Sequence, residues 1–383
     1  MSASLRGSVA IVGVGTAGIG QAPGRTHLEL LAQASAQALK EAGLTLKDVD
    51  GLFTSTLVNF FPTLTIGEYL GLRPKIAGGT NLGGASFVDH VMSAALALNA
   101  GLCNVALICY GSNAKSGSGK HTTMADQPPY EAPYEPRMPI TAYALAAARH
   151  MHQYGSTRRH LAEIAVAARR WAQLTPEASE RGPLTIDEVL SARMNCDPLS
   201  IRDCCLVSDG AGAVVMVRAE RARDLAQKPI YFLGGAAAQW HRQISAMPDL
   251  TVTAAVESGP RAFAMAKLSP ADVDVVQLYD AFTINVLLFL EDLGFCKKGG
   301  GGDFVANGGI APGGRLPVNT NGGGLSYCHP GMYGIFLLTE ATRQLRGEAG
   351  ERQVAGAEVA LCHGNGGTLS SQVTAIFGTA ATL

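Results

Sequence analysis

Three short segments in the second half of the sequence carry side chains that can donate or accept protons. These are the tyrosine of YDAF (279–282), the histidine of the glycine-rich TNGGGLSYCHPG (320–331) and the cysteine of the glycine-rich LCHGNGG (361–367). A positioned phenol, imidazole or thiol can transfer a proton, and donors directed at an oxygen that gains negative charge stabilise an enolate. A histidine after a cysteine is more often structural, but here a glycine-rich turn, a His-Pro pair and a later Cys-x-Gly occur together. These segments are therefore the candidate active site.

A different chemistry is suggested by IVGVGTAGIG (11–20), where Gly13, Gly15 and Gly18 have the G-x-G-x-x-G spacing of a dinucleotide-binding loop. In such a loop the third glycine opens a helix, and an acidic residue follows ~20 residues later. Here the helical pattern begins only near Thr26, and the next strand, GLFTST, ends without a carboxylate. We therefore predict a surface loop at these glycines and no nicotinamide site.

The composition is that of a globular protein without nucleic-acid or membrane features. The 383 residues are 47% hydrophobic with a formal net charge of -1, and they form no basic stripe or acidic tail. No apolar run approaches the ~18 residues of a membrane span, and the N-terminus lacks the apolar core of a signal peptide. The cysteines contain no C-x-x-C pair, which excludes the usual zinc spacing. We predict no metal, no nucleic-acid partner, and reduced thiols in the cytoplasm.

The sequence also repeats itself. Three pairs of segments recur in the same order: AGLTLKDVDGLFTST (42–56) with AKLSPADVDVVQLYDAF (266–282), TNLGGAS (80–86) with TNGGGLS (320–326), and NVALICYG (104–111) with EVALCHGNG (358–366). In each copy, strand-like runs alternate with runs of helical periodicity, which favours parallel sheets with covering helices. We predict a duplicated α/β fold, with one half in residues 1–228 and the other in residues 229–383.

The first half contains a long insertion, from about residue 112 to residue 200. It includes GSGKHTTMADQPPYEAPYEPRMP, which is rich in Pro, Gly and Ser, and helical stretches such as LAEIAVAARRWAQL. An irregular segment of this length is usually a lid or a binding loop. We therefore predict a loop domain within the first half.

Taken together, these segments resemble the thiolase superfamily, most closely its sterol-carrier-protein-type and lipid-transfer-protein thiolase-like branch. The resemblance covers essentially the whole chain, and DCCLVSDGAGAVV (203–215) is similar to the family's strand at the end of the first half. It implies two βαβαβ halves in a layered α/β/α/β/α arrangement, with a loop domain inserted in the first half. It also implies an enzyme that makes or breaks a carbon–carbon bond near the thioester of an acyl-CoA.

The resemblance implies roles for individual residues. His329 matches the histidine of the family's Gly-His-Pro motif, which donates a hydrogen bond to the developing oxyanion. Cys362, in Cys-x-Gly form with Gly364, matches the acid–base cysteine that takes a proton from the carbon beside the thioester. Tyr279 occupies a position that is Asn in most thiolases and His in the sterol-carrier branch.

Departures from the family pattern change the expected chemistry. Thiolases carry a nucleophilic cysteine at a helix start, where the helix dipole lowers its pKa. Aligning GGASFVDHVMSAALAL with that motif places Gly84 at the cysteine position. Next to His329, Cys328 replaces the usual glycine, and a shorter GMYG segment introduces Tyr333. The expected nucleophile is therefore missing, and a second tyrosine is added near the site.

Without the nucleophile, an aldol or retro-aldol step is the preferred hypothesis, because it needs only a base for a β-hydroxyl and stabilisation of an enolate. Homologues in this branch include steroid side-chain aldolases that lack the nucleophile. We predict that Tyr279, Tyr333 and His329 supply the acid–base and oxyanion groups for a 3-hydroxyacyl-CoA. Asp280 and His363, in the same segments, are further candidates.

Two alternatives stay open. The first is an acetyl-CoA acyltransferase (thiolase) with a non-standard nucleophile, either Ser86 at a predicted helix start or Cys109 at a strand end. A helix N-cap and a small buried core residue are the structural interpretations of the same two residues. The second alternative is a non-catalytic homologue that binds acyl-CoA or scaffolds a complex, although His329 and the Cys362 segment favour an enzyme.

The resemblance also implies the partners. A coenzyme A thioester is expected as substrate, with no permanently bound cofactor, and the loop domain is expected to cover its pantetheine arm. By analogy the protein is expected to be a homodimer. Because the steroid side-chain aldolases of this branch work with a small zinc-binding OB-fold (DUF35-type) protein, such a partner is expected here too.

Overall fold

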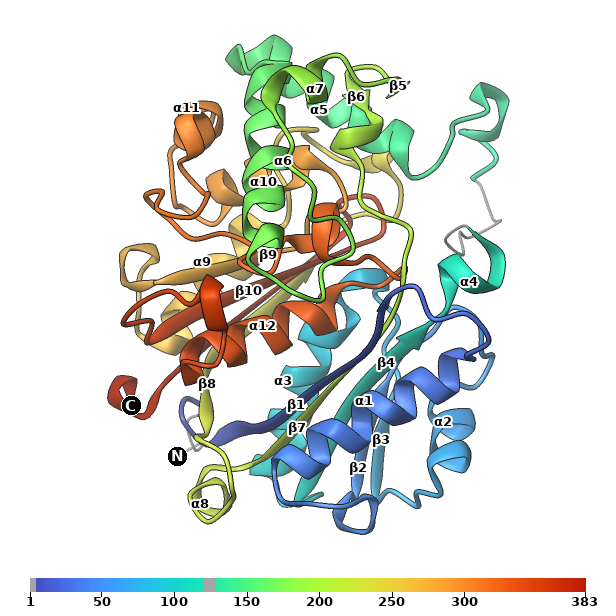
Figure 1. The fold of residues 1–383 in the computed structure, drawn as a ribbon, viewed down its shortest axis with the longest axis vertical. Coiled ribbons are helices and arrows are strands. Elements are labelled where there is room, and N and C mark those ends of the chain that lie inside the picture. Colours follow the sequence, from blue (N-terminus) through green and yellow to red (C-terminus); the bar gives the residue numbers. More distant parts are fainter. Residues whose placement is uncertain (1–4, 120–127) are drawn as a thin grey trace.

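The computed structural model describes residues 5–119 and 128–383 of the chain (Figure 1). Its main feature is a nine-stranded mixed sheet in the order β3-β2-β4-β7-β1-β8-β11-β10-β9. The strands of this sheet are β1 (Val9–Gly20), β2 (Gly51–Thr54), β3 (Ile76–Gly78), β4 (Val105–Ser112), β7 (Asp209–Arg218), β8 (Ile230–Gln239), β9 (Val275–Leu278), β10 (Val359–Gly366) and β11 (Ser371–Gly378). A second, two-stranded sheet pairs β5 (Met194–Cys196) with β6 (Leu199–Ser200).

Helices cover the sheet on both sides and also separate its two halves. The α-helices are α1 (His27–Glu41), α2 (Pro62–Leu70), α3 (Ser86–Asn99), α4 (Ala114–Ser118), α5 (Ile140–Tyr154), α6 (Arg158–Gln173), α7 (Ile186–Leu190), α8 (Ala219–Ala222), α9 (Ala255–Ala266), α10 (Thr283–Asp292), α11 (Gly301–Val305) and α12 (Gly334–Arg346). α1 packs on β1, β4 and β7, and α9 packs on β8 and β11. α3 and α12 contact each other and strands of both halves, so they form a central layer (Figure 1). The predicted layered α/β arrangement is confirmed.

The two halves of the main sheet repeat one pairing scheme. β2 is parallel to β4, which is antiparallel to β7, which is antiparallel to β1. In the same way, β9 is parallel to β10, which is antiparallel to β11, which is antiparallel to β8. The prediction of parallel sheets is therefore wrong for most neighbours. β10 and β11 follow each other after a short turn, and only antiparallel neighbours can be joined so directly.

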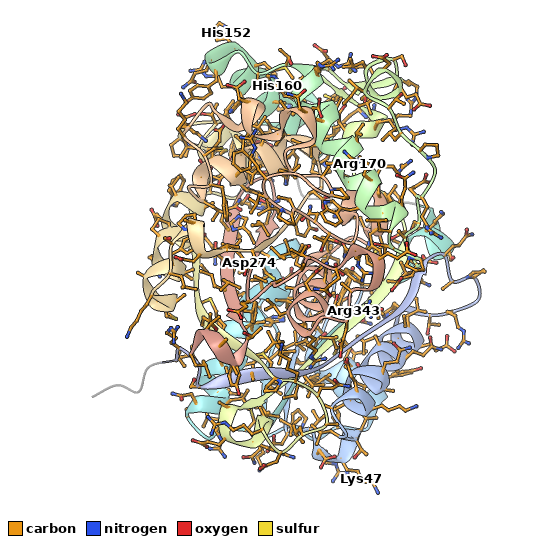
Figure 2. The ribbon with its side chains drawn as sticks, turned by 60° about the vertical axis from the view of Figure 1, so that its left-hand side comes forward. Lys47, His152, His160, Arg170, Asp274 and Arg343 are labelled. Carbon is orange, nitrogen blue, oxygen red and sulfur yellow. The ribbon has the colours of Figure 1, made fainter. Side chains whose placement is uncertain are left out.

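The repeated Asp-Val-Asp segments have the same structural role in both halves. Asp50 accepts the backbone N–H of Val105 at 2.9 Å, which ties the start of β2 to the start of β4. Asp274, labelled in Figure 2, accepts the backbone N–H of Val359 at 2.9 Å and ties β9 to β10. The sequence repeat therefore marks a structural repeat. The predicted boundary at residues 228 and 229 falls between β7 and β8 and stays a prediction.

Gly13 and Gly15 lie inside β1 and not in a surface loop, so that prediction is wrong. A Cβ atom on Gly13 would lie 2.0 Å from the carbonyl oxygen of Ala38, and one on Gly15 would lie 2.2 Å from that of Ala34. Both carbonyl groups belong to α1. The glycines therefore let α1 pack directly against the strand, which explains their spacing without a dinucleotide.

The predicted loop domain supplies α4 to α7 and the small sheet, and residues 120–127 of it lie outside the described residues. α6 packs against α10, α11 and the π-helical turn Gly323–Tyr327. Tyr143 of α5 donates to the carbonyl oxygen of Gly367 at 2.9 Å and stacks on Phe282. The insertion thus lies against all three candidate segments. In the part of the chain that the structure describes, no helix is both long and apolar enough to cross a bilayer.

Candidate active site

Three of the predicted site residues meet around the hydroxyl of Tyr279. Tyr279 directly follows β9, and its backbone N–H donates to the carbonyl oxygen of His363 in β10 at 3.0 Å. At the turn before α12, the N–H of Tyr333 donates to the Tyr279 hydroxyl at 3.2 Å, and this hydroxyl donates to the carbonyl oxygen of Gly331 at 3.4 Å. His329 Nε2 lies 3.1 Å from the same hydroxyl. The structure therefore brings Tyr279, His329 and Tyr333 together.

The fourth residue of this cluster is Gly84, in the turn Gly83–Ala85 directly before α3. A Cβ atom on Gly84 would lie 2.1 Å from Cε2, 2.2 Å from Cζ and 2.3 Å from the hydroxyl oxygen of Tyr279. Such distances are far inside van der Waals contact, so the tyrosine occupies the space that a side chain at position 84 would need. A cysteine at position 84 and this placement of Tyr279 exclude each other.

Tyr279 is a neutral phenol with a proton acceptor beside it. The residue is 4% exposed. Burial raises the pKa of Tyr279 well above its usual value, although the N–H of Tyr333 acts in the opposite direction. Tyr279 is therefore not a resident phenolate at neutral pH. It can accept a proton if it passes its own to His329 Nε2, and their 3.1 Å separation permits this transfer.

Tyr333 packs beside this pair but directs its hydroxyl elsewhere. Its ring lies edge-on to Tyr279, with centroids 5.9 Å apart, and nearly parallel to the ring of His329, with centroids 6.1 Å apart. The Tyr333 hydroxyl donates to Oδ1 of Asn321 at 3.0 Å. Burial, followed by the negative charge of Asp280, raises the pKa of Tyr333 well above its usual value.

Two residues that sequence reasoning missed hold this cluster in place. Asn321 accepts the hydroxyl of Tyr333, and Ser208 Oγ accepts the backbone N–H of His329 at 2.9 Å. A signal for Asn321 was present in the repeat TNLGGAS and TNGGGLS. In both copies the asparagine side chain, Asn81 or Asn321, accepts the N–H two residues later, at 3.1 Å and 2.9 Å. For Ser208 the repeat gives no such signal.

Asp280 holds the glycine-rich turn that leads to His329. Its carboxylate accepts the N–H of Gly324 at 2.6 Å and that of Leu325 at 3.4 Å. Burial raises the pKa of Asp280 to about 7, although the same N–H groups act in the opposite direction. A carboxyl with this pKa changes its protonation near neutral pH. It accepts the N–H groups of the turn and not the Tyr279 hydroxyl.

Cys362 and Gly364 face the central helices from β10. The thiol of Cys362 donates to the carbonyl oxygen of Leu337 in α12 at 3.4 Å, and burial raises its pKa far above the usual value. A Cβ atom on Gly364 would lie 3.0 Å from Cα of Ala85 and 3.1 Å from Val88, so this glycine packs on the start of α3. The thiol is thus engaged by α12 in this structure. Its acid–base role stays a prediction.

The side chain of His363 points to the neighbouring strand β11. Its Nδ1 lies 2.9 Å from Thr374 Oγ1, and its Nε2 lies 2.8 Å from Gln372 Oε1. Burial lowers the pKa of His363 to about 4, so the ring is neutral near pH 7. His363 contributes to the cluster through its backbone carbonyl, which accepts the N–H of Tyr279.

The two alternative nucleophiles, Ser86 and Cys109, are engaged in a turn and in the core. Ser86 is the first residue of α3, and its Oγ donates to the carbonyl oxygen of Gly83 at 2.7 Å and accepts the N–H of Leu82 at 2.9 Å. Cys109 is fully buried in β4, and burial raises its pKa to about 12. Ser86 thus closes the turn before its helix, and Cys109 is a core residue. A nucleophilic role for either stays a prediction.

The cluster is closed to solvent. Tyr279 and His329 are 4% and 5% exposed, and Tyr333 is fully buried. One pocket borders the cluster at residues 330–331, where the carbonyl oxygen of Gly331 accepts the Tyr279 hydroxyl. Within residues 5–119 and 128–383, no group of three His, Cys, Asp or Glu side chains is placed to hold a metal ion.

Comparison with known proteins agrees with this geometry. Residues 236–379 match the family model described as Thiolase C-terminal domain-like. The acetyl-CoA acetyltransferase of Methanothermobacter thermautotrophicus is 34% identical over 381 residues, with 96% of this chain and 99% of the relative covered. The 17-hydroxy-3-oxo-4-pregnene-20-carboxyl-CoA lyase of Mycobacterium tuberculosis is 36% identical over 385 residues, with 93% of this chain and 96% of the relative covered.

A solved structure extends the comparison to three dimensions. The structure named Ltp2-ChsH2(DUF35) aldolase superimposes with a TM-score of 0.90 at 32% identity, and the alignment covers 98% of each chain. The fold and the site thus define a layered α/β protein of the thiolase type, in which Tyr279 fills the space that a side chain at position 84 would need. The chain belongs to the thiolase superfamily. Its relatives named above are acyltransferase, lyase and aldolase enzymes.

Proposed function

We propose that this chain breaks or forms the bond between the α- and β-carbons of a 3-hydroxyacyl-CoA by an aldol-type step. The observation that carries the proposal is that Tyr279 fills the space that a side chain on Gly84 would need. The site therefore has a phenol where the family carries its nucleophile. The full-length similarity to a pregnene-carboxyl-CoA lyase and to the Ltp2-ChsH2(DUF35) aldolase supports the same reaction class.

In the cleavage direction, the proton of the substrate's 3-hydroxyl moves to the oxygen of Tyr279 while the Tyr279 proton moves to His329 Nε2. The bond between the α- and β-carbons then breaks. The β-carbon becomes a carbonyl, and the electron pair of the bond forms the enolate of the thioester. The α-carbon takes the proton back from the His329 imidazolium through Tyr279, so the enzyme ends in its starting state.

The surroundings of Tyr279 favour this transfer. The N–H of Tyr333, at the start of α12, donates to the Tyr279 oxygen at 3.2 Å and stabilises negative charge that develops there. Burial excludes water, which strengthens this interaction and protects the enolate from unwanted protonation. The proton thus moves along fixed groups within a dry cluster.

An acetyl-CoA acyltransferase is the second candidate, because the acetyl-CoA acetyltransferase relative is 34% identical over nearly the whole chain. Such a reaction needs a side chain that carries the acyl group. Ser86 is engaged in a turn and Cys109 is fully buried in the core, so the geometry favours the aldol step over this alternative.

For substrate and partners, we propose a coenzyme A thioester that binds under the loop domain, without a resident cofactor. The Ltp2-ChsH2(DUF35) neighbour supports a small DUF35-type partner. A homodimer and a cytoplasmic location complete this proposal.

Product analysis tests the proposed function. The protein is incubated with 3-hydroxyacyl-CoA thioesters, and separately with 3-ketoacyl-CoA thioesters and free coenzyme A, each with and without a DUF35-type protein. We expect equimolar shortened acyl-CoA and an aldehyde or ketone from the hydroxyacyl substrates. Thiolysis of the ketoacyl substrates alone would overturn the proposal in favour of an acyltransferase. Binding without turnover of either class would favour a non-catalytic homologue.

A further inference from the structure

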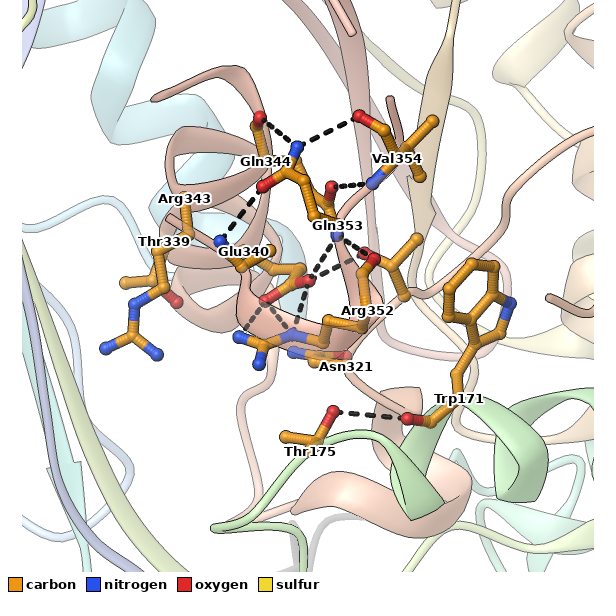
Figure 3. A network of polar contacts seen from close by, with 12 residues as sticks. Trp171, Thr175, Asn321, Thr339, Glu340, Arg343, Gln344, Arg352, Gln353 and Val354 are labelled. Atoms are coloured by element: carbon orange, nitrogen blue, oxygen red, sulfur yellow. Dashed lines mark hydrogen bonds and ion pairs between the residues drawn. The ribbon is translucent and has the colours of Figure 1, made fainter. Parts of the chain in front are cut away.

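Three consecutive polar residues, 319–321, connect the two tyrosines to the second half of the sheet. Asn319 Oδ1 accepts the N–H of Leu278, the last residue of β9, at 2.7 Å. Thr320 Oγ1 donates to the carboxylate of Glu340 in α12 at 2.6 Å. This carboxylate is part of the buried network in Figure 3, in which Asn321 is also labelled. The segment therefore fixes both the strand that leads to the first tyrosine and the helix that follows the second.

The amide of Asn321 is held in one orientation. Its Oδ1 accepts the N–H of Gly323 at 2.9 Å and the hydroxyl of Tyr333 at 3.0 Å. A backbone N–H can only donate, so the amide oxygen, and not the nitrogen, faces both groups. The Tyr333 hydroxyl must therefore direct its proton toward Asn321.

This orientation makes the two tyrosines chemically different. The Tyr279 hydroxyl donates to the carbonyl oxygen of Gly331 at 3.4 Å, receives a backbone N–H at 3.2 Å and lies 3.1 Å from the imidazole of His329, which takes its proton in the proposed step. Tyr333 faces an amide oxygen, which is too weak a base to take a proton, and burial keeps the pKa of Tyr333 well above its usual value. When only one of two titratable groups has a partner that can take its proton, that group is the one that exchanges protons. Here that group is Tyr279.

We propose that Asn321 is a positioning residue that directs the hydroxyl proton of Tyr333 away from the reacting atoms. Tyr333 then offers the bound substrate only oxygen lone pairs, and the proton transfer belongs to Tyr279 alone. This inference rests on the proposed function and deepens it. Asn321 acts through Tyr333.

A double-mutant cycle tests the inference. Asn321→Leu removes the acceptor at similar volume, and Tyr333→Phe removes the hydroxyl. We expect Tyr333→Phe to lower kcat for hydroxyacyl-CoA cleavage by about fivefold with little change in KM, since it deletes one buried hydrogen bond. Asn321→Leu also removes the acceptor of the Gly323 N–H, so its loss of kcat should be at least as large. The double variant should stay within about twofold of Asn321→Leu, because the hydrogen bond that Tyr333→Phe deletes is already absent there.

Thr320→Val is the matched control, because it likewise removes two neighbouring bonds, to Glu340 and from the Gln277 amide, and leaves the Tyr333 hydroxyl its acceptor. Its effect on kcat should multiply with that of Tyr333→Phe. If the effect of Asn321→Leu multiplies in the same way, Asn321 acts only on the loop, and the inference is overturned while the aldol step stands. If the wild-type protein cleaves no hydroxyacyl-CoA, the proposed function fails. In that case, additive losses in the free energy of unfolding for Asn321→Leu and Tyr333→Phe would show that the two side chains share no hydrogen bond.

Discussion

The hydroxyl of Tyr279 is the one group in the cluster that has both a backbone donor and an imidazole within hydrogen-bond distance. We expect Tyr279→Phe to lower kcat by at least ~100-fold, because general acid–base groups contribute about 10²–10⁴ in rate. Steady-state kinetics with a 3-hydroxyacyl-CoA measures this loss. Tyr231→Phe, at a buried tyrosine of β8, is the control and should leave kcat unchanged. A Tyr279→Phe variant with wild-type kcat would exclude the proton relay.

Gly84 and Tyr279 should be coupled in stability as well as in chemistry. Gly84→Ala places a methyl group within 2.3 Å of the hydroxyl edge of the Tyr279 ring, and we expect it to lower the free energy of unfolding by about 2 kcal/mol through overpacking. In a Tyr279→Ala background the same change should cost under ~0.5 kcal/mol, because the ring is gone. Urea unfolding of the four proteins measures both costs. Equal costs in the two backgrounds would show that the two residues do not share this space.

Asp280 predicts a pH dependence of stability. Burial raises its pKa from 3.8 to about 7, so the folded state binds this proton more tightly than the unfolded state. Stability from this group is therefore full at low pH and is lost as pH rises through that interval. We expect Asp280→Asn to lose less free energy of unfolding between pH 5 and pH 8 than the wild-type protein loses. Parallel pH profiles for both proteins would contradict the raised pKa.

The residues of the site differ in how far the sequence could reveal them. His329 and Tyr279 stand in recognisable segments, and Gly84 was visible as a departure from the family pattern. The direction of a hydroxyl is set by its three-dimensional partner, so the bond from Tyr333 to Asn321 was beyond sequence reasoning. The same holds for Ser208, which lies in the loop before β7 and accepts the backbone N–H of His329.

Among the elements, α12 links the site to a buried ion pair, because Tyr333 is its N-cap and Glu340 lies about two turns later in the helix. Burial alone would raise the pKa of Glu340, but the charge and hydrogen bonds of Arg352 lower it below the usual value. The Arg352 guanidinium donates from Nε and Nη2 at 3.0 Å each, and this buried ion pair holds the helix to the 350–352 turn (Figure 3).

We expect Arg352→Met to lower the free energy of unfolding by about 3–5 kcal/mol, because it leaves the Glu340 carboxylate buried without its cation. Thermal or urea unfolding measures the loss. Lys75→Met is the control: the Lys75 side chain is 66% exposed in its pair with Asp50, and such pairs contribute at most about 1 kcal/mol. A loss of similar size in both variants would mean that the buried pair has no special role.

Element types followed from the sequence where periodicity and repetition agreed, as in the two Asp-Val-Asp segments before β2 and β9. The contacts between elements could not be predicted in this way. The glycines of β1 have the spacing of a phosphate-binding loop, yet they serve helix packing, because only the fold shows that α1 lies directly on them. The antiparallel pairing of β10 with β11 likewise depends on a turn whose geometry periodicity does not show.

At the scale of the whole molecule, the site exists because the two halves share a central layer. Gly84 precedes α3 in the first half, whereas Tyr279 and Tyr333 belong to the second, and α3 packs against α12. The duplication and the layered fold could be predicted from repeats and family motifs. The overlap of Gly84 with Tyr279 could not, since residues so distant in sequence are brought together only by the packed halves.

The most direct test of catalysis without an acyl-enzyme is the mass of the intact protein during turnover. Samples are quenched with acid while a 3-hydroxyacyl-CoA is being consumed, and the protein mass is compared with the amount of product. We predict an unmodified mass at every time point while product accumulates, because Gly84 has no side chain to acylate. An acylated species that forms and decays at the rate of product formation would contradict this mechanism and restore a nucleophile to the site.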